Sequence, residues 1–354
     1  MAQGFQVLPR GTKDPGFPQP QAVVVTEAVG ASSTFELVYP FTIEEGDLPL
    51  LADDRLGPQA ELVVTAAEGD TATAVLVRGV VSTQKARLVV GGDGSQLVVS
   101  GSDFLVALDR EQRTRKWADA SDDTILSSLI AGCGATPRVS LPAVVTRQES
   151  KAVLMQRETD LHLLHRLARH QGCWVWSEYS LPQAPATVHV ERPPTGAAAS
   201  GELYLNGPKR NIDSVELQWN IHRAVAASSA CRDAQAGTDM DGSVQRSPLA
   251  QLAGQGLADI AQAPVKALLS VVTAEAADLT VRSEAAAIEQ GWFVAVQLRA
   301  SGKRLRQVFH AAQVLALHGL GARHSGKYLV ARVVHHLDDD DHTMDLTLVR
   351  DSWE

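Results

Sequence analysis

The stretch RETDLHLLHRLARHQGCWVWSE, residues 157–178, decides the fold, because it joins a helix signal directly to a strand signal. Apolar residues recur on one helix face, namely Leu161, Leu164, His165, Leu167 and Ala168. Thr159 or Asp160 can accept hydrogen bonds at the start of this helix, and Gly172 allows the positive φ that favours its end. We therefore predict an amphipathic helix at the edge of a core.

The residues after Gly172 predict a strand. Cys173 to Ser177 are rich in aromatic and β-branched side chains, and Trp174 and Trp176 lie two residues apart, so both point to one side. A second helix, Leu279 to Ile288, ends near Gly291, and Trp292 to Val296 then begin another strand. We interpret Trp174, Trp176 and Trp292 as core residues because each lies in an apolar strand context.

Two separated stretches carry a family resemblance. The runs QRETDL (156–161), LHRLA (164–168) and GCW (172–174) resemble the phage late control gene D family. This family includes the myovirus tail hub and the hub part of type VI valine-glycine repeat spike proteins. A second match, GLGARHSGKYLV (319–330), precedes a hairpin that ends in TLVR (347–350). The resemblance covers roughly residues 102–353 and fades over the first ~100 residues, where only the pattern of strands agrees.

The resemblance implies a mainly β fold, with two antiparallel tube-protein-like β-barrels and a helix-containing α+β domain. It also implies a homotrimer that adapts a sixfold inner tube to a threefold spike, beside baseplate or wedge proteins. In the type VI proteins a small barrel and a needle follow the hub in the same chain. This sequence ends at Glu354, directly after the hub hairpin, so we expect a separate spike protein.

The expected domains follow from these patterns. They are an extended N-terminal arm (1–21), a first barrel (22–104), an α+β module (105–204 and 260–307), a flexible linker (236–259) and a second barrel (205–235 and 308–354). The arm contains four prolines, which exclude a regular helix or central strand. It is either a disordered terminus or an arm that lies over a neighbouring subunit.

Short β-branched runs dominate the first barrel and favour an antiparallel barrel or sandwich. They are Val23–Val25, Phe35–Val38, Leu62–Val64, Val75–Val77, Leu88–Val90 and Leu97–Val99. Gly91 to Gly94 separate the last two runs and predict a hairpin loop. A phosphate-binding loop is disfavoured here because no helix follows and no Lys-Ser/Thr pair is present.

Composition limits the function. The chain has 354 residues, of which 45% are hydrophobic and 21% charged, as in globular proteins. Its net charge of −9 argues against nucleic acid as the main ligand. We recognise neither a long apolar run nor a secretory signal, so we predict no membrane span, synthesis in the cytoplasm and assembly into a tail-like particle. Cys133, Cys173 and Cys231 form no C-x-x-C pair and are interpreted as buried thiols.

Acidic and histidine clusters are candidate metal or catalytic sites. Asp338 to Asp341 lie beside His335, His336 and His342, but consecutive strand residues point to opposite sides, so we expect a solvated hairpin tip. Asp239 and Asp241 lack the remaining ligands of a calcium loop. Asp122 and Asp123 fit the first turn of a helix that runs to Gly132.

No enzyme signature was found. The histidines at 162, 165 and 170 lie around one helix, which offers at most two metal ligands on one face. Nucleophile-elbow, zinc-protease and phosphate-loop motifs are absent from the sequence. We therefore expect a structural protein with no catalytic residues, metal or cofactor. A tail-borne enzyme that degrades the cell envelope and a β-rich carbohydrate-binding or adhesion module remain the alternatives.

Overall fold

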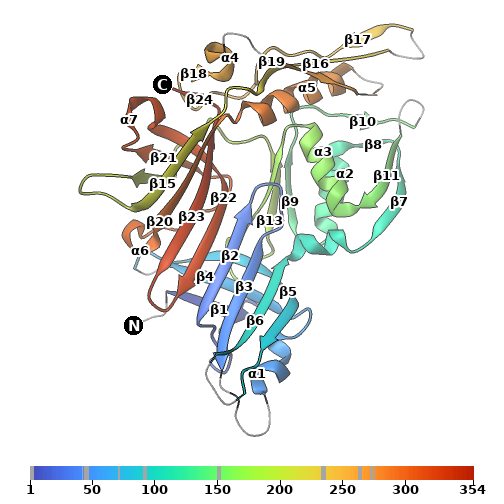
Figure 1. Ribbon diagram of the computed structural model, residues 1–354. Coiled ribbons are helices and arrows are strands. Elements are labelled where there is room, and N and C mark those ends of the chain that lie inside the picture. The colour runs from blue at the N-terminus through green and yellow to red at the C-terminus, as the bar shows by residue number, and fades with distance from the viewer. Residues whose placement is uncertain are drawn as a thin grey trace.

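The computed structural model describes residues 4–41, 43, 48–70, 72–90, 94–149, 153–232, 237–261, 265–271, 273 and 276–354. Strands dominate these residues, and the longer helices gather in one part of the molecule (Figure 1). The predicted fold class, mainly β with a helix-containing α+β part, is confirmed.

The first sheet unit contains six strands with a core of its own. They are β1 (Phe5–Pro9), β2 (Ala22–Ala28), β3 (Thr34–Phe41), β4 (Glu61–Glu68), β5 (Ala72–Arg87) and β6 (Ser95–Asp103). Their order across the sheet is β1-β4-β5-β6-β3-β2, and every neighbouring pair is antiparallel. Alternate residues of β2 and β3, such as Val23, Val25, Phe35 and Leu37, point into the core, as the period of a strand requires.

The N-terminal segment, expected as an extended arm, folds mostly onto its own chain. β1 pairs with β4, and Phe5, Val7 and Phe17 are buried in the first core. The side chain of Gln19 bridges back to β1, because its Oε1 accepts from Val7 N at 2.9 Å and its Nε2 donates to Val7 O at 3.1 Å. Pro9 is tolerated because β1 is an edge strand, and the other three prolines lie between β1 and β2. Residues 1–3 lie outside the described residues.

One of the expected strands is not formed. Leu88 and Val90 lie beyond the end of β5 and are 49% and 89% exposed, so the predicted run Leu88–Val90 is not a strand. The expected loop at Gly91–Gly94 lies between β5 and β6, but residues 91–93 are outside the described part of the chain.

The second sheet unit also contains six strands. They are β14 (Gly201–Tyr204), β15 (Ile212–Trp219), β20 (Val294–Ser301), β21 (Val314–His318), β22 (Gly326–Asp338) and β23 (His342–Arg350). β14 and β20 were expected in the α+β module. They join this sheet because β14 pairs with β21, and β20 pairs with both β15 and β23.

The side chain of Asn211 links the first two strands of this second unit. The Asn211 side chain accepts from Tyr204 N at 2.7 Å and donates to Glu202 O at 3.0 Å, so it links β14 to the start of β15. Gln19 makes the corresponding link in the first unit. Residues of the second unit form a separate core that includes Val330, Leu346 and Leu348.

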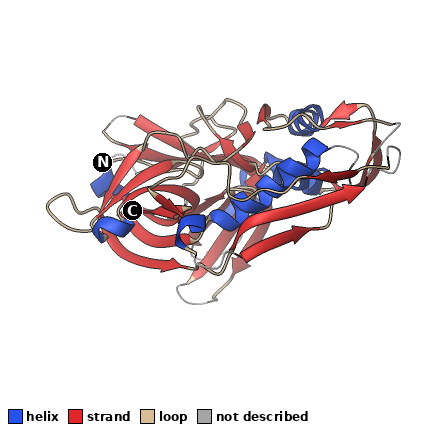
Figure 2. Cartoon of the chain, turned by 90° about the horizontal axis from the view of Figure 1, so that it is seen from above, coloured by secondary structure: helices blue, strands red, loops and turns tan. Residues whose placement is uncertain are grey.

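One strand pair joins the two sheet units. β2 pairs antiparallel with β22, with Val25 opposite His335, so the two units form one twelve-stranded sheet. Viewed from above, the strands curve around the end of the molecule that carries both termini, and the longer helices lie toward the other end (Figure 2). The seam between the units is therefore held by backbone hydrogen bonds rather than by a flexible linker.

The α+β module is built around two helices. Its elements are β7 (Gln112–Trp117), β8 (Ala120–Ser121), α2 (Asp122–Gly132), β9 (Thr136–Ser140), β10 (Thr146–Arg147), β11 (Leu154–Thr159), α3 (Asp160–His170), β12 (Trp174–Glu178) and β13 (Thr187–Glu191). The helix α3 begins as its sequence indicates, because Thr159 Oγ1 accepts from His162 N at 3.3 Å. Gly172 follows its end with φ +67°.

The buried face of α3 lies slightly to one side of the predicted face. Leu163, Leu164, Leu167 and Ala168 are buried, whereas Leu161 is only half-buried.

The interpretation of the tryptophans as core residues also needs correction. Val175 points into the core, so Trp174 and Trp176 point to the opposite side and are half-buried. Trp174 packs against Trp292 with ring centroids 5.5 Å apart, and Trp176 stacks on His189 at 4.7 Å.

An insertion between β15 and β20 lies beside the α+β module (Figure 1). It contains β16 (Ala224–Arg232), β17 (Asp239–Asp241), β18 (Gln255–Gly256), α4 (Leu257–Ile260), β19 (Val265–Leu269) and α5 (Ala276–Gly291). Much of the expected linker 236–259 lies here, although residue 236 is outside the described residues. Gly172 lets α5 approach α3, since an added Cβ would lie 2.9 Å from Ile288 Cδ1 and 3.0 Å from Ala285 Cα.

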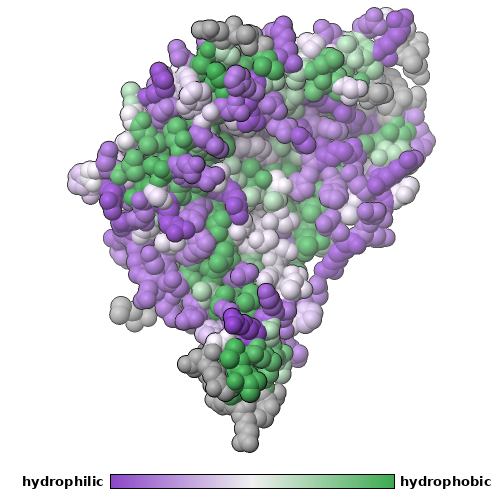
Figure 3. All heavy atoms as spheres, in the orientation of Figure 1, coloured by the Kyte–Doolittle hydropathy of each residue, from purple (hydrophilic) through white to green (hydrophobic). Residues whose placement is uncertain are grey.

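Short elements complete the chain: α1 (Pro49–Ala52), the 3₁₀ turns Asp54–Leu56 and Phe104–Asp109, α6 (Gly302–Leu305), α7 (Gly321–His324) and β24 (Ser352–Trp353). Hydrophobic side chains reach the surface near α1, whereas the region of α2 and α3 is mostly hydrophilic (Figure 3).

Within the described ranges, no helix is both long and apolar enough to cross a membrane. The three cysteines are free, and Cys173 is buried.

Candidate functional site

Four ionisable side chains meet at the seam between the two sheet units. We call Glu27, His310, His335 and His342 the seam cluster. Glu27 points inward from β2, on the same side as Val23 and Val25. His335 points inward from β22, directly opposite Val25, so it lies diagonally next to Glu27.

His310 reaches the cluster from the segment between α6 and β21. Its backbone N–H donates to Gln313 Oε1 at 3.1 Å, and Ala312 N donates to Val330 O at 2.8 Å, which fixes the segment against β22. His310 Nδ1 then lies 3.0 Å and 3.2 Å from the two carboxylate oxygens of Glu27. A backbone donor, Ala311 N, adds a longer contact of 3.4 Å to the same carboxylate.

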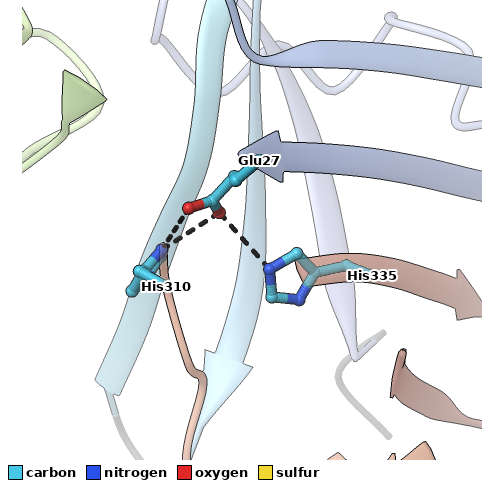
Figure 4. A group of neighbouring side chains, drawn as sticks. All are labelled: Glu27, His310 and His335. Atoms are coloured by element: carbon cyan, nitrogen blue, oxygen red, sulfur yellow. Dashed lines mark hydrogen bonds and ion pairs between the residues drawn. The ribbon is translucent and has the colours of Figure 1, made fainter. Parts of the chain in front are cut away.

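The two histidines of the β22–β23 hairpin extend the cluster inward. His335 Nε2 lies 3.3 Å from Glu27 Oε1, and His335 Nδ1 lies 3.1 Å from His342 Nε2. Figure 4 shows Glu27 between His310 and His335, which approach it from two different segments of the chain. Glu27 is 4% exposed and His335 is fully buried, so water does not replace these contacts.

The electrostatics of the cluster favour one charge pair, between the buried Glu27 and the half-buried His310. Burial alone would raise the pKa of Glu27, but attraction and hydrogen bonding from His310 and His335 outweigh burial and lower this pKa to about 2. Burial lowers the pKa of His310, yet the Glu27 carboxylate reverses this and raises it above the ordinary value. Burial lowers the pKa of His335, and it lowers that of His342 to about 3. The carboxylate is therefore ionised, and His310 carries the balancing charge.

A polar cleft of about 410 Å³ lies beside the exposed side of His310. Its lining includes Glu68, Glu178 and Tyr179 as well as His310 and Gln313. Glu27, His310 and His335 each offer one ligand atom, and these atoms lie within 4.8 Å of one another. The set has the chemistry of a zinc site, but its members already neutralise and hydrogen-bond one another, so we assign it no metal.

The structure separates the histidines of the predicted hairpin. His335 is buried, whereas His336 faces outward and lies 3.1 Å from Asp345 Oδ2, as their alternation predicts. The tip residues Asp338, Asp339 and Asp340 are exposed. The Asp338 carboxylate accepts from the backbone N–H groups of residues 340 and 341 at 2.9 and 2.7 Å, so it shapes the turn.

Other candidates have structural partners of their own. Asp122 is buried at the start of α2, where Arg147 donates to both of its oxygens at 2.8 and 2.7 Å. Asp239 lies 3.3 Å from Arg232, and Asp241 accepts from the hydroxyl of Ser243 at 2.6 Å. His162 is exposed, while the histidines at 165 and 170 are half-buried. Among the described residues, the group of potential metal ligands that lie close together is Glu27, His310 and His335, and it contains none of these three histidines.

Sequence reasoning did not find Glu27 or His310. The sequence VVVTEA around Glu27 indicates an ordinary strand, and His310 follows it by 283 positions. A charged residue at an inward position of an alternating strand was the one available signal. The strand pairing that brings these residues together is not encoded in either local sequence.

Comparison with solved structures identifies the class of fold. The chain is similar to a tail protein from Neisseria meningitidis, with a TM-score of 0.68, 13% identity and coverage of 98% of this chain and 97% of that one. It is also similar to the 43 kDa tail protein of prophage MuSo2 from Shewanella oneidensis, with a TM-score of 0.66, 14% identity and coverage of 100% of both chains. The fold is therefore one found in phage tail proteins.

A third similar structure comes from a secretion system. It is the E. coli c3393 protein, a type VI secretion component described as structurally similar to the T4 tail proteins gp27 and gp5. The TM-score is 0.61 at 12% identity, with coverage of 98% of this chain and 76% of that one. At such low identities these likenesses show a shared fold.

Comparison with protein-family models assigns the chain to a family. The family described as the Alg8 N-terminal domain matches residues 5–339, so the chain belongs to that family. This description differs from the late control gene D family predicted from the sequence, although the tail-protein fold agrees with the broader prediction. A search of curated proteins finds no match.

Proposed function

We propose that this protein is a structural hub subunit of a phage tail or a contractile injection system. In this proposal it forms a homotrimer of the late control gene D type, which adapts a sixfold inner tube to a threefold spike. Further partners are the baseplate or wedge proteins around it. The particle is assembled in the cytoplasm from soluble subunits.

The observation that carries this proposal is the pair of sheet units within one chain. Each unit has its own core, and β2–β22 pairing holds the two side by side in one sheet. Three copies arranged about a threefold axis would present six such units. A threefold assembly can then match a sixfold ring at one face while keeping threefold symmetry at the other.

The seam cluster supports a structural role rather than a catalytic one. Its carboxylate, Glu27, is buried and pairs with His310 and His335 at the place where the two sheet units join. Removing one member of such a pair leaves an uncompensated buried charge, so the cluster resists separation of the units. A joint that transmits force during injection needs this property.

Mass measurement and pull-down test the proposal directly. Native mass spectrometry should give a complex of three times the 37.8 kDa of one chain. Co-expression with candidate tube and spike proteins from neighbouring genes should yield a complex that contains all three. A protein that stays monomeric at every concentration and binds neither partner would refute the proposal, as would stoichiometric cleavage of cell-wall glycan by the isolated chain.

A further inference from the structure

The two sheet units repeat one another in chain order. Six strands of the first unit match six of the second by their neighbours in the sheet: β1 and β14, β2 and β15, β3 and β20, β4 and β21, β5 and β22, β6 and β23. The pairings among the last five strands of each unit agree in direction. Only the pairing of the first strand differs, because β1–β4 is antiparallel and β14–β21 is parallel. Each unit also carries a short helix after its third strand, α1 or α6.

An irregularity at the same place fixes the alignment of the two units. The β5–β6 register shifts between Val81 and Thr83, and the β22–β23 register shifts between Val330 and Arg332. Aligning these shifts places Ala86 at the position of His335. The inward residues of β6 and β23 then coincide, for example Leu97 with Met344.

The edge of β22 is paired in the second unit, whereas the equivalent edge of β5 is free in the first unit. Residues Arg332–Asp338 of β22 pair with β2, beyond the part of β22 that pairs with β21. The equivalent segment, residues 83–89, consists of the end of β5 and the two residues after it, and it begins beyond the part of β5 that pairs with β4. Among the described residues β5 pairs only with β6 there, and residues 82–88 are exposed on both faces.

A matching strand is also free. β15 corresponds to β2, but it is the last strand of the sheet and pairs only with β20 in the described part of the chain. The two free edges lie on opposite sides of the molecule, so one copy cannot join them to each other (Figure 1). Exposed strand edges carry unpaired N–H and C=O groups that favour pairing with another chain.

We propose that β15 of one copy pairs antiparallel with residues 83–89 of a second copy, the end of β5 and the two residues after it, as β2 pairs with β22 within a chain. The repeat gives the register. Val25 lies opposite His335, so Leu217 lies opposite Ala86 of the second copy. By the same alignment, Glu216 lies opposite Arg87 and Val215 lies opposite Leu88.

Charge and hydrophobicity of the two edges fit this register. Lys85 and Arg87 make the β5 edge basic, whereas Asp213 and Glu216 make β15 acidic. Leu88 is 49% exposed, and Val215 is only half-buried beside the second core, so their pairing would cover apolar surface. Such opposite-charge and apolar cross-strand pairs stabilise antiparallel pairing.

This inference rests on the proposed trimer and names its interface. A head-to-tail contact repeated about a threefold axis closes a ring in which seams within chains alternate with seams between chains. Closure removes both free edges. The seam cluster has no counterpart at the contact between copies, because Glu27 and His335 correspond to Trp219 and Ala86. The two kinds of seam are therefore chemically different.

Cysteine trapping tests the register. Ala86→Cys combined with Leu217→Cys should form a disulfide between copies and give covalent trimers on a non-reducing gel, because residues opposite each other in antiparallel strands are close enough. Each single variant and the off-register pair Ala86→Cys with Gln218→Cys serve as controls. They should remain monomeric on the same gel, although the native cysteines are present in all of them.

A charge exchange tests the same contact without oxidation. Arg87→Glu should raise the protein concentration at half-dissociation by about tenfold or more, and Arg87→Glu with Glu216→Arg should restore it. Arg138→Glu, at an exposed site in the α+β module, is the matched control and should have little effect. If the trimer forms but gives no specific cross-link, and the charge exchange does not change its concentration of half-dissociation, this pairing is wrong while the hub proposal stands. A wild-type chain that never assembles overturns both.

Discussion

Replacing Glu27 by glutamine should weaken the seam between the two sheet units. Glutamine keeps the size of the side chain but removes the charge that His310 and His335 face at 3.0 and 3.3 Å. Although burial opposes the charge, these histidines lower the pKa of Glu27 from 4.5 to about 2. A shift of that size corresponds to a loss of about 3 kcal/mol in the free energy of unfolding.

The sign of the pH effect sets the assay conditions. A lowered carboxyl pKa stabilises the folded state above the unfolded value, and the stabilisation is lost as pH falls toward about 2. The raised pKa of His310 stabilises the folded state at low pH, and this contribution is lost as pH rises through the folded value. Both groups are charged at about pH 6, where Glu27→Gln should have its largest effect.

Urea unfolding at that pH, followed by tryptophan fluorescence, measures the change. Asp345→Asn is the matched control, because Asp345 also pairs with a histidine of β22 but is 37% exposed, and it should lose about 1 kcal/mol or less. If Glu27→Gln loses no more than this control, the buried pair does not stabilise the seam and the reasoning fails.

Three further predictions concern other parts of the chain. Leu164→Asp puts a charge on the buried face of α3 and should cost several kcal/mol in urea unfolding, whereas His162→Asp on the exposed face should cost little; equal stabilities would show that the helix is wrongly oriented. Serine at all four positions of Asp338–Asp341 should change the melting temperature little, since the tip is mostly exposed, and unfolding together with loss of a stoichiometric metal would contradict this. Burial raises the pKa of Asp103 to about 6 despite three donated hydrogen bonds, so its protonated form is favoured in the folded state. Stability should therefore fall by about 3 kcal/mol between about pH 4 and 6, and Asp103→Asn should remove this part of the pH profile; an unchanged profile would refute it.

The helix α3 shows how far local sequence can be trusted. Thr159 caps its start and Gly172 follows its end, as the sequence predicts, because capping and backbone conformation depend on adjacent residues. The tryptophans of β12 show the limit. Their alternation correctly places both on one side, but the sequence does not say which side faces the core. That choice depends on the packing of α2 and α3 against Val175.

The candidate site lay beyond sequence analysis for a related reason. His335 and His336 were correctly expected to diverge, since strand geometry alone separates neighbours. Both partners of Glu27 are distant in sequence, because His335 lies on β22 and His310 lies in the segment before β21. The pairing of β2 with β22 brings Glu27 beside His335, and the hydrogen bonds of the segment before β21 bring His310 to them.

By itself the sequence determined the class of fold, the position of α3 and the long C-terminal hairpin, because side-chain period, caps and turn residues act over a few positions. The tertiary structure decided that β14 and β20 belong to the second sheet unit, that the N-terminal segment supplies β1, and that Glu27 meets two histidines. These depend on which strand edges meet, and strand pairing is satisfied by backbone groups that every residue carries. Local sequence therefore specifies the strands, while the collective packing of their cores selects their partners.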